Sequence, residues 1–177
     1  MISQQYIIED KIYIGGGYNY GMELMLRKNR GRLTGWIGYA LGWAYRHTAQ
    51  INDGKPYPAK QDRRHDLSIV ANYRINRRWD CSAVFVYATG NALTMPESMY
   101  LVGENAVCEY GPHNGGRMPA YHRLDLSANY WISKKKNTEQ VINISLYNAY
   151  NRNNPAYLAV DILSLIHISE PTRRVVI

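Results

Sequence analysis

Alternation with a period of two residues is the feature that most constrains how this chain folds. In residues 65–76, "HDLSIVANYRIN", an apolar side chain occupies every second position from Leu67 to Ile75. Polar residues occupy the positions between them, apart from Val70. Side chains of a strand point to opposite sides in turn, so the pattern predicts strands with one apolar and one polar face.

The same alternation recurs along most of the chain, for example in "RLDLSANYWI" (123–132) and "VINISLYNAY" (141–150). We predict six strands, at about 17–28, 32–48, 63–76, 79–89, 119–132 and 140–149. Several of them exceed the five or six residues of a common globular strand. A strand that crosses a membrane needs roughly 9–11 residues, so the predicted lengths suit a bilayer.

The predicted connections alternate between short and long. Short turns fall at 29–31, 77–78 and 133–139, whereas long loops fall at 49–62 and 90–118. Outer-membrane barrels have short turns on the periplasmic side and long loops on the extracellular side. A soluble β-sandwich would give a less regular alternation.

The aromatic composition favours the same class of fold. The chain has 16 Tyr and 4 Trp but one Phe, whereas a soluble core would use Phe freely. Tyr and Trp concentrate where apolar and wet surroundings meet, as at membrane interfaces. The net charge of +7 is spread along the chain rather than gathered in a stripe, so we expect no nucleic-acid partner.

Motifs for catalysis or metal binding are weak. Cys81 and Cys108 have no His or Cys at ligand spacing, so we expect neither a metal nor a cofactor. "DRRHD" contains Asp62, His65 and Asp66, but His65 and Asp66 would point to opposite faces of a strand. No Ser or Cys lies in a nucleophile elbow. We therefore interpret the motif as charge-paired residues where a strand leaves its loop, and we expect no enzyme.

Six blocks of sequence carry a resemblance to a known family. They are "YGMELML", "GRLTGWIGYAL", "DGKPYPAKQDRRHDLSIVANY", "VYATGNALTMP", "GGRMPAYHRLDLSANY" and "SLYNAYNRNNP". In this order they resemble the C-terminal part of TonB-dependent outer-membrane receptors of the Bacteroidetes type, which carry an N-terminal carboxypeptidase-regulatory-like domain. The resemblance runs from Gly17 to Pro155, and "DRRHDLS" and "RMPAYHRLDLS" are its most specific parts.

The resemblance implies an all-β fold, an antiparallel transmembrane β-barrel fragment with about six meandering strands of a roughly 22-stranded barrel. It implies import of a scarce nutrient (a metal chelate, a vitamin or an oligomer) across the outer membrane of a Gram-negative bacterium. The implied partners are the TonB energising complex, reached through an N-terminal part, outer-membrane lipid, a surface lipoprotein and the imported small molecule or oligomer. Residues 1–162 would be a partial C-terminal segment of the barrel.

Residues 163–177 read differently from the rest. "LSLIHISEPTR", from Leu163 to Arg173, can be encoded by the transposase adapter of shotgun sequencing libraries. We therefore expect a non-native tail that arose by reading into adapter. The alternative is a natural final strand, since Leu163, Leu165 and His167 alternate weakly, but Pro171 would interrupt it.

Two sets of residues are candidates for function. Long loops without regular structure are often functional, so we predict ligand contacts from the loop 90–118, namely Tyr100, Glu104, Tyr110, His113 and Asn114. For the polar wall facing the lumen we predict Arg123, Asp125, Asn72 and Asn129, with Arg123 and Asp125 as an ion pair of the wall or a contact to the plug that fills such barrels. Two other classes stay open: an outer-membrane enzyme barrel, which requires a catalytic cluster, and a soluble β-sheet binding protein, which requires a second sheet over the apolar faces.

Overall fold

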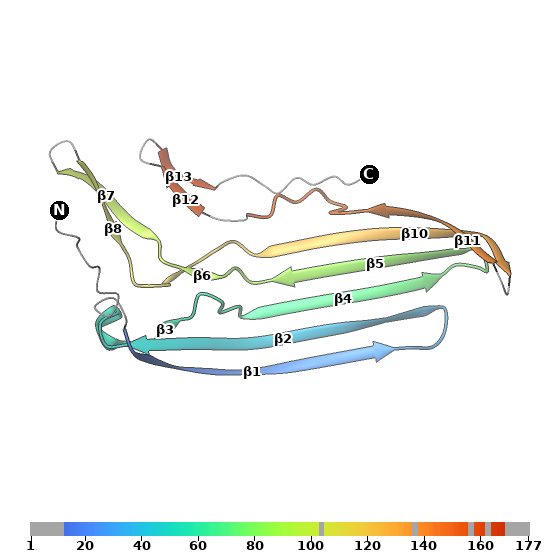
Figure 1. Ribbon diagram of the computed structural model, residues 1–177, viewed down its shortest axis with the longest axis horizontal. Coiled ribbons are helices and arrows are strands. Elements are labelled where there is room, and N and C mark those ends of the chain that lie inside the picture. The colour runs from blue at the N-terminus through green and yellow to red at the C-terminus, as the bar shows by residue number, and fades with distance from the viewer. Residues whose placement is uncertain (1–12, 103–104, 136–137, 156–157, 162–163, 169–177) are drawn as a thin grey trace, which may run out of the picture.

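The computed structural model describes residues 13–102, 105–135, 138–155, 158–161 and 164–168 (Figure 1). Six long strands form one antiparallel sheet in which every strand pairs with its neighbours in the chain. They are β1 (Gly15–Lys28), β2 (Leu33–Thr48), β4 (His65–Arg74), β5 (Trp79–Ala88), β10 (Tyr121–Lys135) and β11 (Thr138–Leu146). The six strands predicted from the alternation are confirmed, each to within a few residues.

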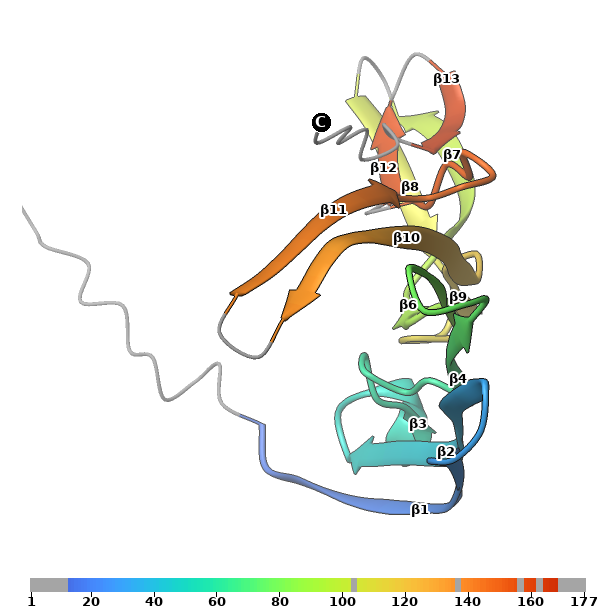
Figure 2. The ribbon, with the colours of Figure 1, turned by 90° about the vertical axis from the view of Figure 1, so that its right-hand side faces the viewer.

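The sheet is curved into an open arc, which is seen when the molecule is viewed along its strands (Figure 2). Strands β1 and β11 lie at its two edges, and the described strands do not close into a barrel. Figure 1 shows that the strands run side by side, with the short turns at one end and the long loops at the other. The chain is therefore an all-β, antiparallel, meandering sheet.

The short turns are formed by local hydrogen bonds. In the turn between β4 and β5, the side-chain oxygen of Asn76 accepts hydrogen bonds from the backbone N–H groups of Arg78 (2.8 Å) and Trp79 (2.9 Å). Asparagine favours turns because its side chain bonds the backbone two residues ahead. In the turn between β1 and β2, Gly31 has a φ of 99°, a conformation that side chains disfavour.

The long loops contain more structure than the sequence indicated. The loop after β2 holds a short helical turn, η2 (Asn52–Gly54), and β3 (Tyr57–Pro58), which pairs with β2. The loop after β5 was predicted to lack regular structure, and this was wrong. It contains β6 (Ala92–Leu93) paired with β9 (Gly116–Arg117), and a hairpin of β7 (Pro96–Val102) and β8 (Asn105–Tyr110). Figure 1 shows this hairpin standing away from the main sheet.

The C-terminal part also departs in one respect from expectation. β12 (Leu158–Asp161) and β13 (Ser164–Ile168) form a two-stranded sheet of their own and do not pair with the main sheet. A non-native tail gives no reason to expect a regular ladder between the residues from 163 onward and earlier ones, yet β13 pairs with 158–161. A weak alternation is enough for such a local hairpin. The boundary at 162/163 stays a prediction.

The strand register places the alternating side chains on two distinct faces. Ile69 lies between Ile37 of β2 and Phe85 of β5, and Phe85 lies opposite Leu124 of β10. The apolar face, as we call it, includes the residues predicted to share it: Leu67, Ile69, Leu124, Leu126, Ile142 and Ile144. The polar face includes those predicted to lie opposite: Asn72, Asp125, Asn129 and Asn143. Both groupings are confirmed.

The described residues contain no hydrophobic core beneath the sheet. Their buried hydrophobic side chains are Tyr57, Ala59, Ala88 and Ala92, all at the long-loop end. The apolar face instead leaves large side chains exposed. They are Tyr18, Tyr20, Met22, Leu24, Leu26, Leu33, Ile37, Tyr73, Trp79, Leu126, Ile142, Ile144 and Leu146. Neither a helix nor a second sheet of the described chain covers this face.

Candidate functional site

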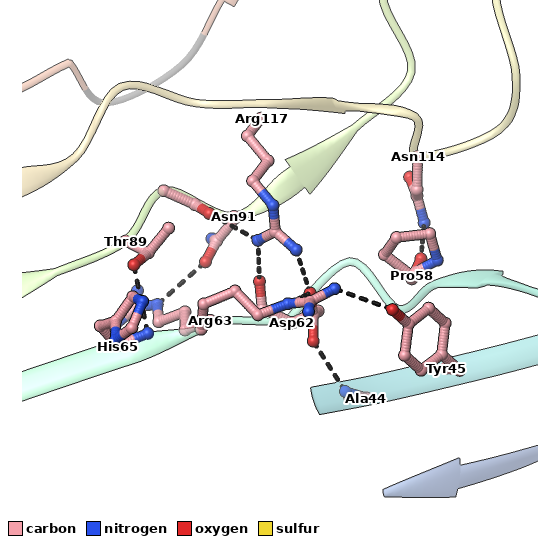
Figure 3. A network of polar contacts seen from close by, with 12 residues as sticks. Ala44, Tyr45, Pro58, Asp62, Arg63, His65, Thr89, Asn91, Asn114 and Arg117 are labelled. Atoms are coloured by element: carbon pink, nitrogen blue, oxygen red, sulfur yellow. Dashed lines mark hydrogen bonds and ion pairs between the residues drawn. The ribbon is translucent and has the colours of Figure 1, made fainter. Parts of the chain in front are cut away.

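The two long loops meet at one end of the sheet, where residues 49–64 contact residues 89–94 and 111–117. We call this region the loop cluster, and Figure 3 shows its polar network. Because β2, β4, β5 and β10 all end here, the sheet positions residues that lie far apart in the chain next to each other. Most of the buried side chains of the described residues lie in the loop cluster.

Asp62 is the centre of the loop cluster and is 1% exposed. Its carboxylate accepts hydrogen bonds from the backbone N–H of Ala44 (2.7 Å), from Nε of Arg64 (3.2 Å) and from Nη2 of Arg117. Nη1 of Arg117 donates to the carbonyl oxygen of the same Asp62 (2.8 Å). A buried carboxylate is stable only when it is paired and hydrogen-bonded, and both conditions are met here.

The environment of Asp62 also controls its protonation. Burial alone would raise the pKa of this carboxyl group, but the hydrogen bonds from Arg117, Ala44 and Arg64 outweigh burial and hold the pKa below its ordinary value. The hydrogen bonds within the loop cluster therefore stabilise the ionised form of Asp62.

This pKa shift predicts how the loop cluster responds to acid. A carboxyl group whose pKa is lower in the folded state stabilises the fold above its unfolded pKa of 3.8, and the contribution is lost as the pH falls through the lower, folded value. We expect the loop amides to be protected against hydrogen exchange at pH 5. This protection should decrease when the pH drops below about 3.8. In Asp62→Asn this pH dependence should disappear. An unchanged acid response in that variant would assign it to another group.

Arg64 joins Asp62 to the aromatic end of β2. Its Nη2 donates to the hydroxyl oxygen of Tyr45 (2.9 Å), and its guanidinium carbon lies 5.4 Å from the ring centre of Trp43 and 5.6 Å from that of Tyr45. A guanidinium over an aromatic face is attracted by the partial negative charge that the ring quadrupole places there. The interpretation of "DRRHD" as charge-paired residues where a strand leaves its loop is confirmed for Asp62 and Arg64. Arg117 was missed, because it lies 55 residues further along the chain.

A second set of contacts holds the tips of the two loops together. Asn114 is 8% exposed, and its side-chain amide donates to the carbonyl oxygen of Pro58 (2.9 Å). Asn52 accepts from the backbone N–H of His113 (2.8 Å) and donates to its carbonyl oxygen (3.3 Å). The ring of His113 packs edge-on against Tyr57 at 4.9 Å. The two loops therefore form one packed unit.

The structure divides the predicted loop contacts into two groups. His113 and Asn114 take part in packing between the loops, and the burial of Asn114 gives it a structural role. Tyr100 and Tyr110 lie on the β7–β8 hairpin and are 50% and 59% exposed. Glu104 lies outside the described residues. Tyr100, Tyr110 and His113 are thus exposed, whereas Asn114 is buried, and a ligand role for any of the five stays a prediction.

A polar hollow of about 610 Å³ opens at the same end of the sheet. It lies between the start of β1, the end of β2 and the loop 49–64, and Asn19, Arg46 and Gln61 are among its lining residues. Their amide and guanidinium groups offer hydrogen bonds to a polar ligand. The sequence did not indicate this hollow, because its wall is assembled from three separate segments.

Arg123 and Asp125 form the predicted ion pair on the polar face. Nη2 of Arg123 lies 2.9 Å from Oδ2 of Asp125, and the guanidinium lies 4.1 Å from the ring centre of Tyr147. Oδ1 of Asp125 accepts a hydrogen bond from the backbone N–H of Asn148 (2.9 Å). The pair thus fixes the segment that leaves β11.

The predicted asparagines of the polar wall are linked across strands. Asn72 accepts a hydrogen bond from Ser82 (2.8 Å), and Asn129 donates to Asp80 (2.7 Å). Asn143 donates to Asn129 (2.6 Å) and to Ser127 (2.8 Å). Such cross-strand pairs stabilise a sheet whose polar face meets water.

Among the described residues, no group of three or more His, Cys, Asp or Glu side chains is arranged to hold a metal ion. Within the same residues, no helix has the length and apolar character required to span a membrane.

The fold and site define an all-β antiparallel sheet with one uncovered apolar face and a packed loop cluster at one end. Comparison with protein-family models, curated proteins and solved structures finds no match to this chain.

Proposed function

We propose that the chain is part of a TonB-dependent receptor in the outer membrane of a Gram-negative bacterium. Such a receptor imports a scarce nutrient, such as a metal chelate, a vitamin or an oligomer, with energy from the TonB complex. The observation that carries the proposal is the apolar face, whose Leu, Ile, Tyr and Trp side chains are exposed or half-buried along the sheet and covered by no second layer of the described chain. A soluble sheet buries such a face, whereas a barrel wall turns it toward lipid.

The order of side chains along the apolar face supports this proposal. Near the long loops the face carries Tyr20, Trp43, Tyr39 and Tyr87, and near the short turns it carries Tyr73, Trp79 and Tyr130. Aliphatic residues such as Leu26, Ile37, Ile69, Leu124 and Leu126 lie between the two groups. Barrels in the outer membrane show the same sequence of aromatic girdle, apolar band and aromatic girdle.

The spacing of the two aromatic groups also fits a bilayer. On β5, Trp79 and Tyr87 are eight residue steps apart. At about 3.4 Å per residue this distance is roughly 27 Å along the strand. A strand tilt of about 40° reduces it to roughly 21 Å across the membrane, close to the apolar band of about 25 Å in such barrels.

The polar face suits a water-filled lumen. Its Asn, Ser and Asp side chains are joined in cross-strand hydrogen bonds, and its ion pair between Arg123 and Asp125 lies beside the loop end. Lumenal positions tolerate such groups because water is present there, whereas lipid-facing positions do not. The packed loops would then lie on the extracellular side, at the mouth of the barrel.

Arginine substitutions at two adjacent positions of β4 test this assignment. Ile69 lies on the apolar face and Ser68 on the polar face, so Ile69→Arg places a charge in lipid and Ser68→Arg places it in the lumen. For the chain folded into phospholipid vesicles, we expect Ile69→Arg to lower the free energy of unfolding by about 2–4 kcal/mol. Urea titration followed by circular dichroism measures the change.

Ser68→Arg is the matched control, since it adds the same side chain one residue away. It should cost at most about 1 kcal/mol. If Ser68→Arg destabilises the chain as much as Ile69→Arg, the assignment of the apolar face to lipid is wrong.

A further inference from the structure

All the short connections of the sheet carry basic residues at the same end. The turns at the ends of β1, β2, β4 and β5 present exposed side chains, and we call this set the basic rim: Lys28, Arg30, Arg32, Arg74, Arg77 and Arg78. Lys134 and Lys135 end β10 at the same end of the sheet. Within the described part of the chain, no ion pair involves Arg30, Arg32 or Arg77. Structural pairing therefore does not account for these charges.

The basic rim directly borders the aromatic group near the short turns. Arg78 precedes Trp79 and Arg74 follows Tyr73, and both aromatic residues lie on the apolar face. Trp79 and Tyr130 pack against each other with ring centres 4.8 Å apart. In a membrane, Trp and Tyr rings lie at the level of the lipid headgroups. Long basic side chains one residue beyond them reach the phosphates while their stems stay near the apolar layer.

The turns that carry the basic rim are held in fixed shapes. Asn76 accepts hydrogen bonds from the N–H groups of Arg78 and Trp79, and Nε of Arg27 donates to the side-chain oxygen of Asn29 (2.8 Å). The backbone that carries the cations is therefore held at defined positions rather than on long flexible loops. Little backbone entropy is lost when such a surface binds a charged partner.

We propose that the basic rim binds the phosphodiester groups of anionic phospholipids in the leaflet that faces the short turns. This inference rests on the proposed membrane function and adds a lipid class to it. A lipid surface fits better than nucleic acid, because the cations follow the margin of an exposed apolar face. Each basic side chain close to an anionic membrane contributes to binding, and the attraction weakens as salt is added.

The experiment compares two vesicle compositions: phosphatidylcholine alone, and phosphatidylcholine with phosphatidylglycerol. The rim variant is Arg30→Gln with Arg77→Gln and Arg78→Gln. The matched control, Arg46→Gln with Lys55→Gln and Lys60→Gln, removes three exposed cations from the long-loop end. The full chain is added from denaturant, and the folded, inserted fraction is measured against lipid concentration in low and high salt.

We expect the unmodified chain to insert into both kinds of vesicle, with at least tenfold stronger partitioning into those with phosphatidylglycerol at low salt. High salt should remove this preference, the rim variant should lose it, and the control should keep it. A preference that survives in the rim variant, or that both variants lose equally, overturns the lipid assignment. The lipid assignment is also overturned if the rim binds a short DNA duplex more tightly than it binds anionic vesicles.

Failure of the proposed function gives a different result. If the unmodified chain inserts into neither kind of vesicle, both the membrane function and the lipid assignment are wrong. If it inserts equally into both at low salt, the membrane function stands and the lipid assignment alone is wrong.

Discussion

In water without detergent, the isolated chain is expected to aggregate rather than to form a folded monomer. The apolar face leaves thirteen large hydrophobic side chains exposed, many of them about half exposed. At roughly 25 cal/mol per Å², each forfeits on the order of 1 kcal/mol when it stays in water. The sum is on the order of 10 kcal/mol, which equals the whole stability of a typical domain, about 5–15 kcal/mol.

The edges of the sheet add to this expectation. β1 and β11 each have a neighbour on one side in the described sheet, so their outer N–H and C=O groups are open. Long exposed edges recruit strands from other chains and promote aggregation. Detergent covers the apolar face, and we therefore expect folded, β-rich protein only in detergent or lipid. Expression without detergent, size-exclusion chromatography and a thermal melt provide the measurement. A monodisperse monomer with a cooperative melt would favour a soluble β-protein.

Asp62→Asn is expected to release the two long loops from each other. The substitution removes the charge that pairs with Arg64 and Arg117, both of which are less than one-third exposed. Removing one partner of a buried ion pair costs about 3–5 kcal/mol. Because the two arginines reach solvent at their edges, we expect roughly 2–3 kcal/mol. In detergent-folded chain, hydrogen exchange at the amide of Ala44, which donates to Asp62, should accelerate by more than tenfold.

Asp53→Asn serves as the control for the loss of one carboxylate. Asp53 lies in the same loop, is exposed and has no ion pair within the described residues. The Asp53→Asn substitution should leave the hydrogen exchange of the Ala44 amide unchanged. The β1–β2 ladder should keep its protection in both variants, since it lies outside the loop cluster. Equal exchange in the unmodified chain and Asp62→Asn would show that Asp62 does not hold the loops.

The strands of the main sheet were predictable because alternation is a local signal. Each long strand has at least nine residues, so an error of one or two residues in where it begins or ends does not change which face a side chain occupies. The register then followed from short turns such as the one fixed by Asn76. The β7–β8 hairpin was missed because Gly, Pro and Asn around it indicated a loop, and its alternation is shorter.

The loop cluster could be predicted only in part. Asp62 and Arg64 are two residues apart, so a charge pair within "DRRHD" could be predicted, but not which residues form it. Arg117 reaches Asp62 only after the chain has passed through β4, β5 and the hairpin. Contacts between distant segments depend on tertiary structure and leave no local pattern. The same reason explains why the burial of Asn114 against Pro58 could not be read from the residues around it.

The most direct test of a lipid-facing apolar surface is a spin-label scan of β4 in vesicles. Cys81 and Cys108 are replaced by Ala, and single labels are placed from Asp66 to Tyr73. Collisions with oxygen, which concentrates in lipid, should be frequent at Leu67, Ile69 and Ala71. Collisions with a water-soluble nickel complex should be frequent at Asp66, Ser68 and Asn72, which gives two curves of period two in opposite phase. Loss of this period, or exclusion of both probes from Leu67, Ile69 and Ala71 as in a second packed sheet, would contradict the account.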